Sequence, residues 1–257
     1  MTEEVTRIEV AATEAGVEEV GEPAGTPAEL APKPESKADV IQLMAKGRDL
    51  SNVDMSGLDL AGMKFTGCQM AKANLADSDI SDGIFAGADA SEVDLSNANL
   101  SGAKFAGVSL ARAILRNVQM AGAKLAGVSL EHADLDSADL TDAKMIGTSL
   151  EGSSAKNANF TAATIAGSNL KGADFTDADL TAATLKRVDV TDADFTGADT
   201  TGARSGKVDW AKAKVPPEQL PEPMPEAPAW VPAAVGAAIA VLLIIFLISK
   251  RKKRQEA

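Results

Sequence analysis

Residues 121–150 read AGAKL AGVSL EHADL DSADL TDAKM IGTSL, with Leu or Met at every fifth position. The same period of five runs from residue 50 to about residue 210. Each fifth residue is apolar or small, and the residue two positions before it is nearly always small. An α-helix places apolar residues about 3.6 positions apart, and a half-buried strand places them about 2 apart. A period of five fits neither, so the sequence predicts a repeat that turns after each pentapeptide.

A second period of twenty residues contains four of these pentapeptides. Residues 61–70, 101–110, 121–130 and 141–150 align with one another at multiples of twenty. Glycine recurs with the same period, at Gly67, Gly87, Gly107, Gly127, Gly147 and Gly167. Glycine at a fixed offset indicates a turn with unusual backbone angles. We therefore expect four pentapeptides to form one coil, with coils stacked about 4.8 Å apart, the spacing of hydrogen-bonded strands.

The central motif of the pentapeptide is seen in NANL at residues 97–100, SADL at 137–140 and DADL at 177–180, each followed by Ser or Thr. These repeats resemble the pentapeptide-repeat family, with its pattern A(D/N)LXX, over roughly two thirds of the chain. The resemblance implies an all-β fold, a right-handed quadrilateral β-helix of about eight coils over residues 48–214. It implies no particular activity, because one fold hosts many functions.

Stacked coils place the central residues of the pentapeptides in four interior columns. One column contains Phe65, Phe85, Phe105, Leu125, Met145, Ile165 and Leu185, and another contains Leu60, Ile80, Leu100, Met120, Leu140, Phe160 and Leu180. The small residue two positions before each centre, such as Ala138, should also point inward. A larger side chain there would overfill a core that is packed to crystal-like density.

Both ends of the stack need a cover, because exposed strand edges invite aggregation. Residues 37–47 read KADVIQLMAKG, a pattern typical of a short amphipathic helix with Gly47 as its stop. We expect this helix to cover the first coil. At the other end the central positions become polar at Thr200 and Ser205. The last coils should therefore be the least stable, with Trp210 as their lid.

The composition changes on both sides of the repeat. Residues 1–36 carry nine glutamates against Arg7 and Lys33, which predicts a disordered acidic arm. Residues 215–229 are rich in proline and glutamate, which predicts a stiff extended linker. Residues 230–249 are apolar throughout. About twenty helical residues span a hydrocarbon core of roughly 30 Å, so we expect one transmembrane helix, followed by a basic tail at residues 250–257.

Two signals disagree about the orientation of this span. The basic tail favours the cytoplasm by the positive-inside rule, which would leave the repeat outside. The N-terminus, however, shows no charged and then apolar signal segment that could start export of the repeat. We expect a cytoplasmic repeat region on a tail-anchored protein. An extracytoplasmic repeat with a cytoplasmic tail is the alternative.

The residue types argue against catalysis. The chain has one histidine, His132, one cysteine, Cys68, and no tyrosine. The common nucleophile, base and metal-ligand clusters therefore cannot be assembled, and we expect neither a cofactor nor a metal site. Cys68 stands at an inward position where other coils have alanine or valine, so it should be a core residue. His132 should be a solvated surface residue.

Acidic residues follow the repeat. One column contains Asp59, Asp79, Asp139, Asp179 and Asp199, with Asn99, Gln119 and Asn159 between them. The simplest interpretation is a solvated face that keeps the protein soluble. The alternative is DNA mimicry, because the family resemblance implies rods of this shape that modulate type II topoisomerases. Direct binding to nucleic acid is not expected of a chain with a formal net charge of −12.

One outward column differs from the rest, and we call it the basic strip. It contains Lys64, Ile84, Lys104, Lys124, Lys144, Thr164, Thr184 and Arg204, beside Ala86, Ala106, Ala126 and Ile146. Its four lysines are candidate binding residues for an acidic protein partner or for the chain's own acidic arm. Alternatively, these lysines are solubilising charges, because exposed charges usually contribute little.

These features together predict a membrane-anchored, non-enzymatic pentapeptide-repeat scaffold or interaction rod. It would contact the membrane through residues 230–249 and bind an unidentified protein. A modulator of type II topoisomerases and a structural protein of the envelope surface are the two alternatives.

Overall fold

The computed structural model describes residues 33–225, and the structural statements below concern these residues. The expected membrane span at 230–249 and the basic tail at 250–257 lie outside the described residues, as do residues 1–32 of the acidic arm. Within residues 33–225, no helix has the length and apolar composition needed to cross a membrane.

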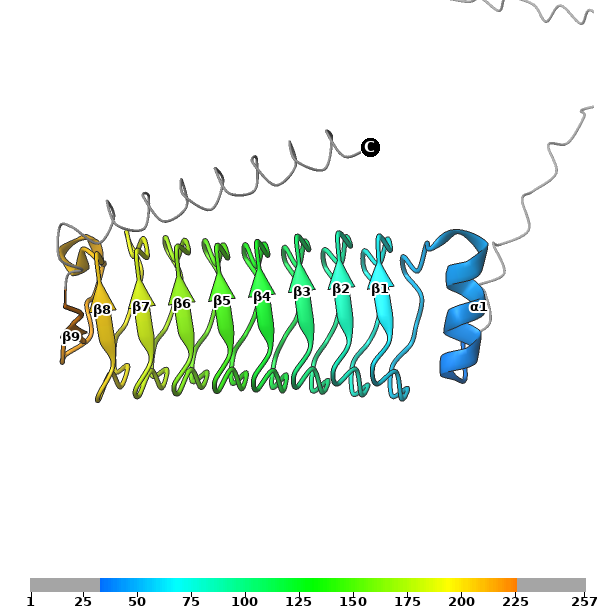
Figure 1. Cartoon of the computed structure of the whole chain (residues 1–257), viewed down its shortest axis with the longest axis horizontal. Coiled ribbons are helices and arrows are strands. Elements are labelled where there is room, and N and C mark those ends of the chain that lie inside the picture. Colours follow the sequence, from blue (N-terminus) through cyan, green and yellow to red (C-terminus); the bar gives the residue numbers. More distant parts are fainter. Residues whose placement is uncertain (1–32, 226–257) are drawn as a thin grey trace, which may run out of the picture. The chain divides into compact units, whose positions relative to one another are not determined.

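The described residues form a parallel β-solenoid with a short helix at one end (Figure 1). Its elements are α1 (Lys37–Gly47), β1 (Lys64–Thr66), β2 (Ile84–Ala86), β3 (Lys104–Ala106), β4 (Lys124–Ala126), β5 (Lys144–Ile146), β6 (Thr164–Ala166), β7 (Thr184–Lys186), β8 (Arg204–Gly206), the 3₁₀-helix η1 (Trp210–Lys212) and β9 (Glu222–Pro223). The strands pair in chain order, β1 to β9. The predicted all-β solenoid of about eight coils is confirmed.

Each coil stacks on the next with an offset of twenty residues. On the strand face, Phe65 pairs with Phe85 and Phe85 with Phe105. On the other three faces the coils meet through single parallel bridges, such as Asp59 with Asp79. Four pentapeptides therefore complete one turn of the solenoid, as the twenty-residue period predicts.

The interior columns are buried as expected. Phe65, Phe85 and Phe105 stack with ring centroids 4.9 and 4.6 Å apart, and their side chains are almost fully inaccessible. Ala138 and Cys68 are also buried, which confirms their inward positions. The inward alanines leave room for the large central residues of neighbouring faces, so that both fit in the narrow core.

The corners of every coil depend on left-handed backbone. The predicted glycine column has positive φ throughout, for example 63° at Gly67 and 59° at Gly167. The same conformation recurs at the other corners, where non-glycine residues such as Asn52, Asp77 and Arg112 adopt it. Asn and Asp tolerate this region better than most residues. The left-handed conformation is therefore not confined to the predicted glycine column.

Most of the regularly spaced acids hold these corners. The Asp79 carboxylate accepts a hydrogen bond from the Ser81 backbone N–H at 2.9 Å, and Asp179 accepts from the Thr181 N–H at 2.8 Å. Such Asx turns let a side chain replace a backbone acceptor where the chain changes direction. The acidic columns therefore have a structural role that the sequence interpretation of a merely solvated face did not include.

Helix α1 covers the first coil. Ser36 caps its N-terminus, with its side chain accepting from the Asp39 N–H, and Val40 is fully buried against the core. The predicted glycine stop is wrong in detail. Gly47 is the last helical residue, and Arg48 adopts the left-handed conformation and donates its N–H to the Met44 carbonyl at 3.0 Å.

The last coil is closed by Trp210 and by the segment that follows it. Trp210 is half-buried, packs edge-on against Phe195 with ring centroids 5.3 Å apart, and donates its indole N–H to Ser205 Oγ. Residues 215–225 then fold back over this end, with Pro217 and Pro221 buried. The proline content predicted a stiff extended linker over residues 215–229, and the described part of it, residues 215–225, packs on the last coil of the solenoid.

Proline ends the hydrogen-bond ladder at β9. Glu222 and Met224 donate their N–H groups to Ala203 and Ser205 of the coil before. Pro223 lies between these two residues and Pro225 follows Met224. The backbone nitrogens of both prolines face the opposite edge of the strand. In regular coils this edge donates to the next coil, as the Gly67 N–H does to Ala86. The last strand has no such donor at these two positions, because proline has no N–H.

Stability should decrease in acid because the corner carboxylates are hydrogen-bonded when ionised. The hydroxyl of Thr196, the ammonium of Lys214 and the Thr196 N–H lower the pKa of Asp194 from 3.8 to about 2. A pKa lowered by folding stabilises the folded state above the unfolded-state value, and this stabilisation is lost as the pH falls from about 4 toward 2. The urea midpoint should therefore fall over this range. The variant Asp194→Asn keeps a side-chain acceptor but cannot titrate, so its urea midpoint should fall less over this pH range. An equal fall would contradict the assignment of Asp194 as a source of the pH dependence.

Restoring the missing backbone N–H donors of β9 should promote dimer formation through the C-terminal edge. In the variant Pro223→Ala/Pro225→Ala, two backbone N–H groups face outward from β9, so the edge can pair with that of a second molecule. Light scattering over a concentration series should show a larger dimer fraction than the wild type. Pro216→Ala, at an exposed position outside the strand, is the matched control. Identical behaviour of the three proteins would refute this role for the prolines.

Candidate interaction surface

The parallel register gathers the basic strip on the strand face. Lys104 pairs with Lys124, and Lys124 with Lys144, so these three lysines are direct neighbours along the ladder. All three are exposed, as are Lys64 and Arg204. The structure brings the four predicted lysines onto one face, with half-buried Ile84 between Lys64 and Lys104.

A second outward column runs beside the basic strip on the same strands. It contains Thr66, Ala86, Ala106, Ala126, Ile146, Ala166, Lys186 and Gly206. Ile146 is 57% exposed, which is high for a large apolar residue in this solenoid. No outward position of β1 to β8 carries an acid. The first acid on this sheet is Glu222, which lies beside Arg204 on β9. Lys186 was missed because only the first column was considered basic.

The strip lysines differ from the lysines of other faces in their charge partners. Lys72 pairs with Glu92 at 3.7 Å, and Lys156 pairs with Asp174 at 3.1 Å. Among residues 33–225, no carboxylate lies within 4.0 Å of Lys64, Lys104, Lys124 or Lys144. The strip is therefore a row of positive charge that the described part of the chain does not neutralise locally.

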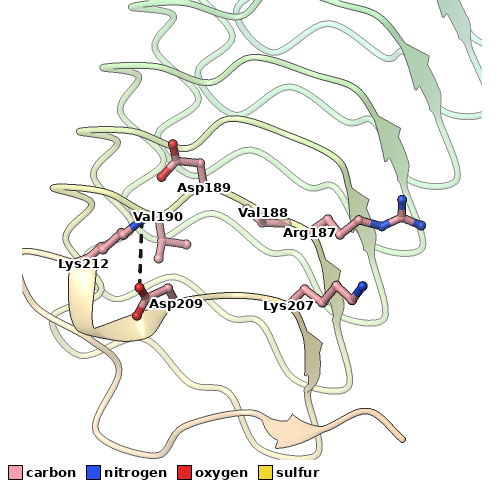
Figure 2. A pocket seen from close by; sticks show the side chains of 7 residues that line it. All are labelled: Arg187, Val188, Asp189, Val190, Lys207, Asp209 and Lys212. Carbon is pink, nitrogen blue, oxygen red and sulfur yellow. Dashed lines mark ion pairs between the residues drawn. The ribbon is translucent and has the colours of Figure 1, made fainter. Parts of the chain in front are cut away.

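A small hollow lies where the strand face turns a corner at the last two coils. Figure 2 shows its seven lining residues, Arg187, Val188, Asp189, Val190, Lys207, Asp209 and Lys212. Its volume is about 310 Å³. Asp209 and Lys212 form an ion pair at 4.0 Å. Hydrogen bonds from the Thr191 hydroxyl and backbone N–H, together with nearby Lys212, lower the pKa of Asp189. The hollow is thus lined by two carboxylates, Asp189 and Asp209, and by three cations, Arg187, Lys207 and Lys212.

A larger groove adjoins the hollow and shares Arg187 and Lys207 with it. Its volume is about 1090 Å³. The walls combine the apolar side chains of Val208, Trp210, Leu220, Met224 and three prolines with Lys186, Arg187, Lys207 and Glu222. Leu220 is 56% exposed. The groove is therefore amphipathic. It was not predicted from the sequence, because residues 215–225 were interpreted as part of a linker.

The residues considered for chemistry are dispersed. Burial raises the pKa of the Cys68 thiol, so Cys68 is a poor nucleophile at neutral pH. His132 lies at a left-handed corner (φ 56°), with its ring over Gly152 of the next coil. Within residues 33–225, no three His, Cys, Asp or Glu side chains are grouped so that they could hold a metal ion.

The family models match two parts of the repeat. Residues 58–135 match the model described as a pentapeptide repeat region, and residues 158–197 match the model of eight copies of the pentapeptide repeat. No curated protein matches the chain.

Several solved structures are similar to this chain. HetL, a protein involved in heterocyst differentiation regulation in the cyanobacterium Nostoc, is 24% identical, with 73% of this chain and all of HetL covered and a TM-score of 0.45. Trypsin-treated QnrB1, a plasmid-mediated fluoroquinolone resistance protein, is 19% identical, with 63% of this chain and 89% of QnrB1 covered and a TM-score of 0.42. Rfr23 of the cyanobacterium Cyanothece is 19% identical, with 68% of this chain and 99% of Rfr23 covered and a TM-score of 0.31. Similarity at this level gives no information on function.

The period of five, the parallel register of twenty and the two family-model matches agree with one another. They support a place for this chain among the pentapeptide-repeat proteins.

Proposed function

We propose that the protein is a membrane-anchored, non-enzymatic scaffold whose basic strip binds an acidic segment of a protein partner. The anchor is the apolar segment at residues 230–249, and the repeat region lies on the cytoplasmic side. Pentapeptide-repeat proteins are generally structural or interaction proteins, in line with a role that needs no catalytic residues.

The contrast between the acids and the strip lysines carries this proposal. The regularly spaced acids on three faces are needed where they stand, because their side chains accept backbone N–H groups at the corners. Lys104, Lys124 and Lys144 have no such contact, and they lie next to one another in the ladder. Like charges about 5 Å apart repel by about 1 kcal/mol even in water. Carboxylates of a partner would relieve this repulsion.

The shape of the strand face also suits a protein partner. The column beside the lysines consists largely of alanine, so a second chain can approach the sheet closely. Ile146 provides an exposed apolar contact in the same column. Interfaces commonly combine an apolar centre with charges that set orientation and association rate.

Topoisomerase modulation is the alternative that the acidic columns favour. Asp139, Asp179 and Asp199 lie in one column of parallel bridges, with Asn159 between the first two. We give it second place because corner hydrogen bonds already account for these acids. A DNA gyrase supercoiling assay with the purified protein separates the two functions: inhibition or protection at near-stoichiometric amounts would favour the alternative.

Reversing the strip charges should weaken partner binding. We expect Lys104→Glu/Lys124→Glu/Lys144→Glu to weaken binding about tenfold or more at low salt, mainly through slower association. The partner is first identified by photo-crosslinking from Ala106 and Ala126, and its affinity is then measured by titration with the purified protein.

The matched control makes the same charge change elsewhere. Lys72→Glu/Lys156→Glu/Lys171→Glu alters three lysines whose charges are paired within the solenoid. Equal losses in the two triple variants would mean that net charge, and not the basic strip, governs binding.

The proposed orientation is tested by protease accessibility of the N-terminal arm. With a cytoplasmic repeat, added protease should cut the arm in inverted membrane vesicles and spare it in intact cells. Cutting in intact cells would instead place the repeat outside and favour an envelope surface protein.

A further inference from the structure

We propose that the C-terminal edge of the strand face binds anionic phospholipid headgroups and so holds this end of the solenoid on the membrane surface. The site consists of Lys186, Arg187, Arg204 and Lys207, which we call the basic corner, together with the adjoining amphipathic groove. This inference rests on the membrane anchor of the proposed function and adds a second, lipid-dependent contact to it.

The basic corner interrupts the glycine column. Six consecutive coils place glycine at this left-handed corner, ending with Gly167 at φ 59°. The next two coils place Arg187 (φ 53°) and Lys207 (φ 57°) in the same conformation. Glycine adopts this backbone most readily, so the fold alone would favour it here as well. Arg187 and Lys207 are thus the two departures from glycine in this column, and both are cations.

Within the described residues, the cations of the basic corner have no ion-pair partner, although acids are close in the sequence. Lys212 and Lys214, from the same end of the solenoid, pair with Asp209 at 4.0 Å and with Asp194 at 3.0 Å. No carboxylate between residues 33 and 225 lies within 4.0 Å of Lys186, Arg187, Arg204 or Lys207. In Figure 2 the Arg187 and Lys207 side chains lie one above the other, with their charged ends on the same side.

The groove beside the corner matches the chemistry of a lipid surface. Its volume of about 1090 Å³ is bordered by Lys186, Arg187 and Lys207 and lined by the apolar surfaces of Trp210 and Met224. Cations can bind headgroup phosphates while tryptophan occupies the boundary between headgroups and acyl chains. Glu222 also lines the groove, but three cations outnumber this one acid.

The chain itself brings this end to the membrane. The described structure ends at Pro225, in the wall of the groove. The apolar segment begins at residue 230, five residues later. Five residues reach at most about 18 Å. Once residues 230–249 are inserted, the groove must therefore lie within that distance of the bilayer. This proximity favours lipid over a soluble acidic protein as the occupant.

The test uses Trp210 as a reporter in the full chain. The protein has two tryptophans, so Trp230→Phe leaves Trp210 as the only donor for energy transfer to dansyl-labelled headgroups. The protein is reconstituted into phosphatidylcholine vesicles with and without added phosphatidylglycerol, and insertion is measured separately by vesicle flotation.

The key variant is Arg187→Gly/Lys207→Gly, which restores the residue that six other coils carry and therefore preserves the fold. The control is Lys156→Thr/Lys171→Thr, which removes two cations from other faces of the solenoid and introduces the residue that the next coil carries at each place, Thr176 and Thr191. Thermal unfolding followed by circular dichroism confirms that both variants are folded.

We expect energy transfer from Trp210 to increase with phosphatidylglycerol and to decrease with salt. Each cation near an anionic surface strengthens binding roughly fivefold, so the double glycine variant should lose the increase while the control keeps it. Insertion with transfer that does not depend on phosphatidylglycerol overturns the lipid site and leaves the anchor intact.

Vesicle flotation distinguishes a failure of the lipid site from a failure of the membrane span. Flotation only with anionic vesicles, lost in the double glycine variant, would support the lipid site and refute the membrane span. Flotation with neither vesicle would refute both. Transfer that increases equally in the double glycine variant would assign the effect to other cations and overturn the basic corner.

Discussion

The parallel hydrogen-bond ladder, with its fixed offset of twenty residues, is the constraint on which the rest of the structure depends. A shift of one residue would turn the interior columns outward, so burial of those columns fixes the register. The same register decides what lies next to what on the surface. Lys104, Lys124 and Lys144 are far apart in the sequence but adjacent in space, because each occupies the same place in its coil.

The ladder also separates surface positions that the fold needs from those that it leaves free. At three faces the residue before each centre often closes a turn, and Asp or Asn is selected there because its side chain accepts a backbone N–H. On the strand face the chain stays extended and no such acceptor is required. Residues on that face can vary without harming the fold, so a consistent charge there is more informative than an equal number of charges elsewhere.

Much of this could be predicted because a short period repeats many times. The coil, the interior columns, the inward Ala138 and the covering helix all follow from positions that recur every five or twenty residues. The ends could not be predicted in the same way, since each occurs once. Composition predicted a linker after residue 215, although the prolines at every second position, Pro221, Pro223 and Pro225, have the two-residue period of a strand. The break of the glycine column at Arg187 was visible in the sequence, but the groove beside it depends on how residues 215–225 fold back.

The polar end of the core has a mechanical consequence. The hydrogen bonds between coils point along the stack, so tension on the C-terminal segment pulls coils apart one at a time instead of shearing the whole solenoid. That tension first separates β9 from β8. It then reaches the coil centred on Thr200 and Ser205, whose side chains are smaller and more polar than the phenylalanines deeper in the stack. Each released coil adds twenty residues, or about 70 Å of extended chain. Under such tension the solenoid would yield from the C-terminal end first, while its distant coils, including Lys104 and Lys124, stay folded.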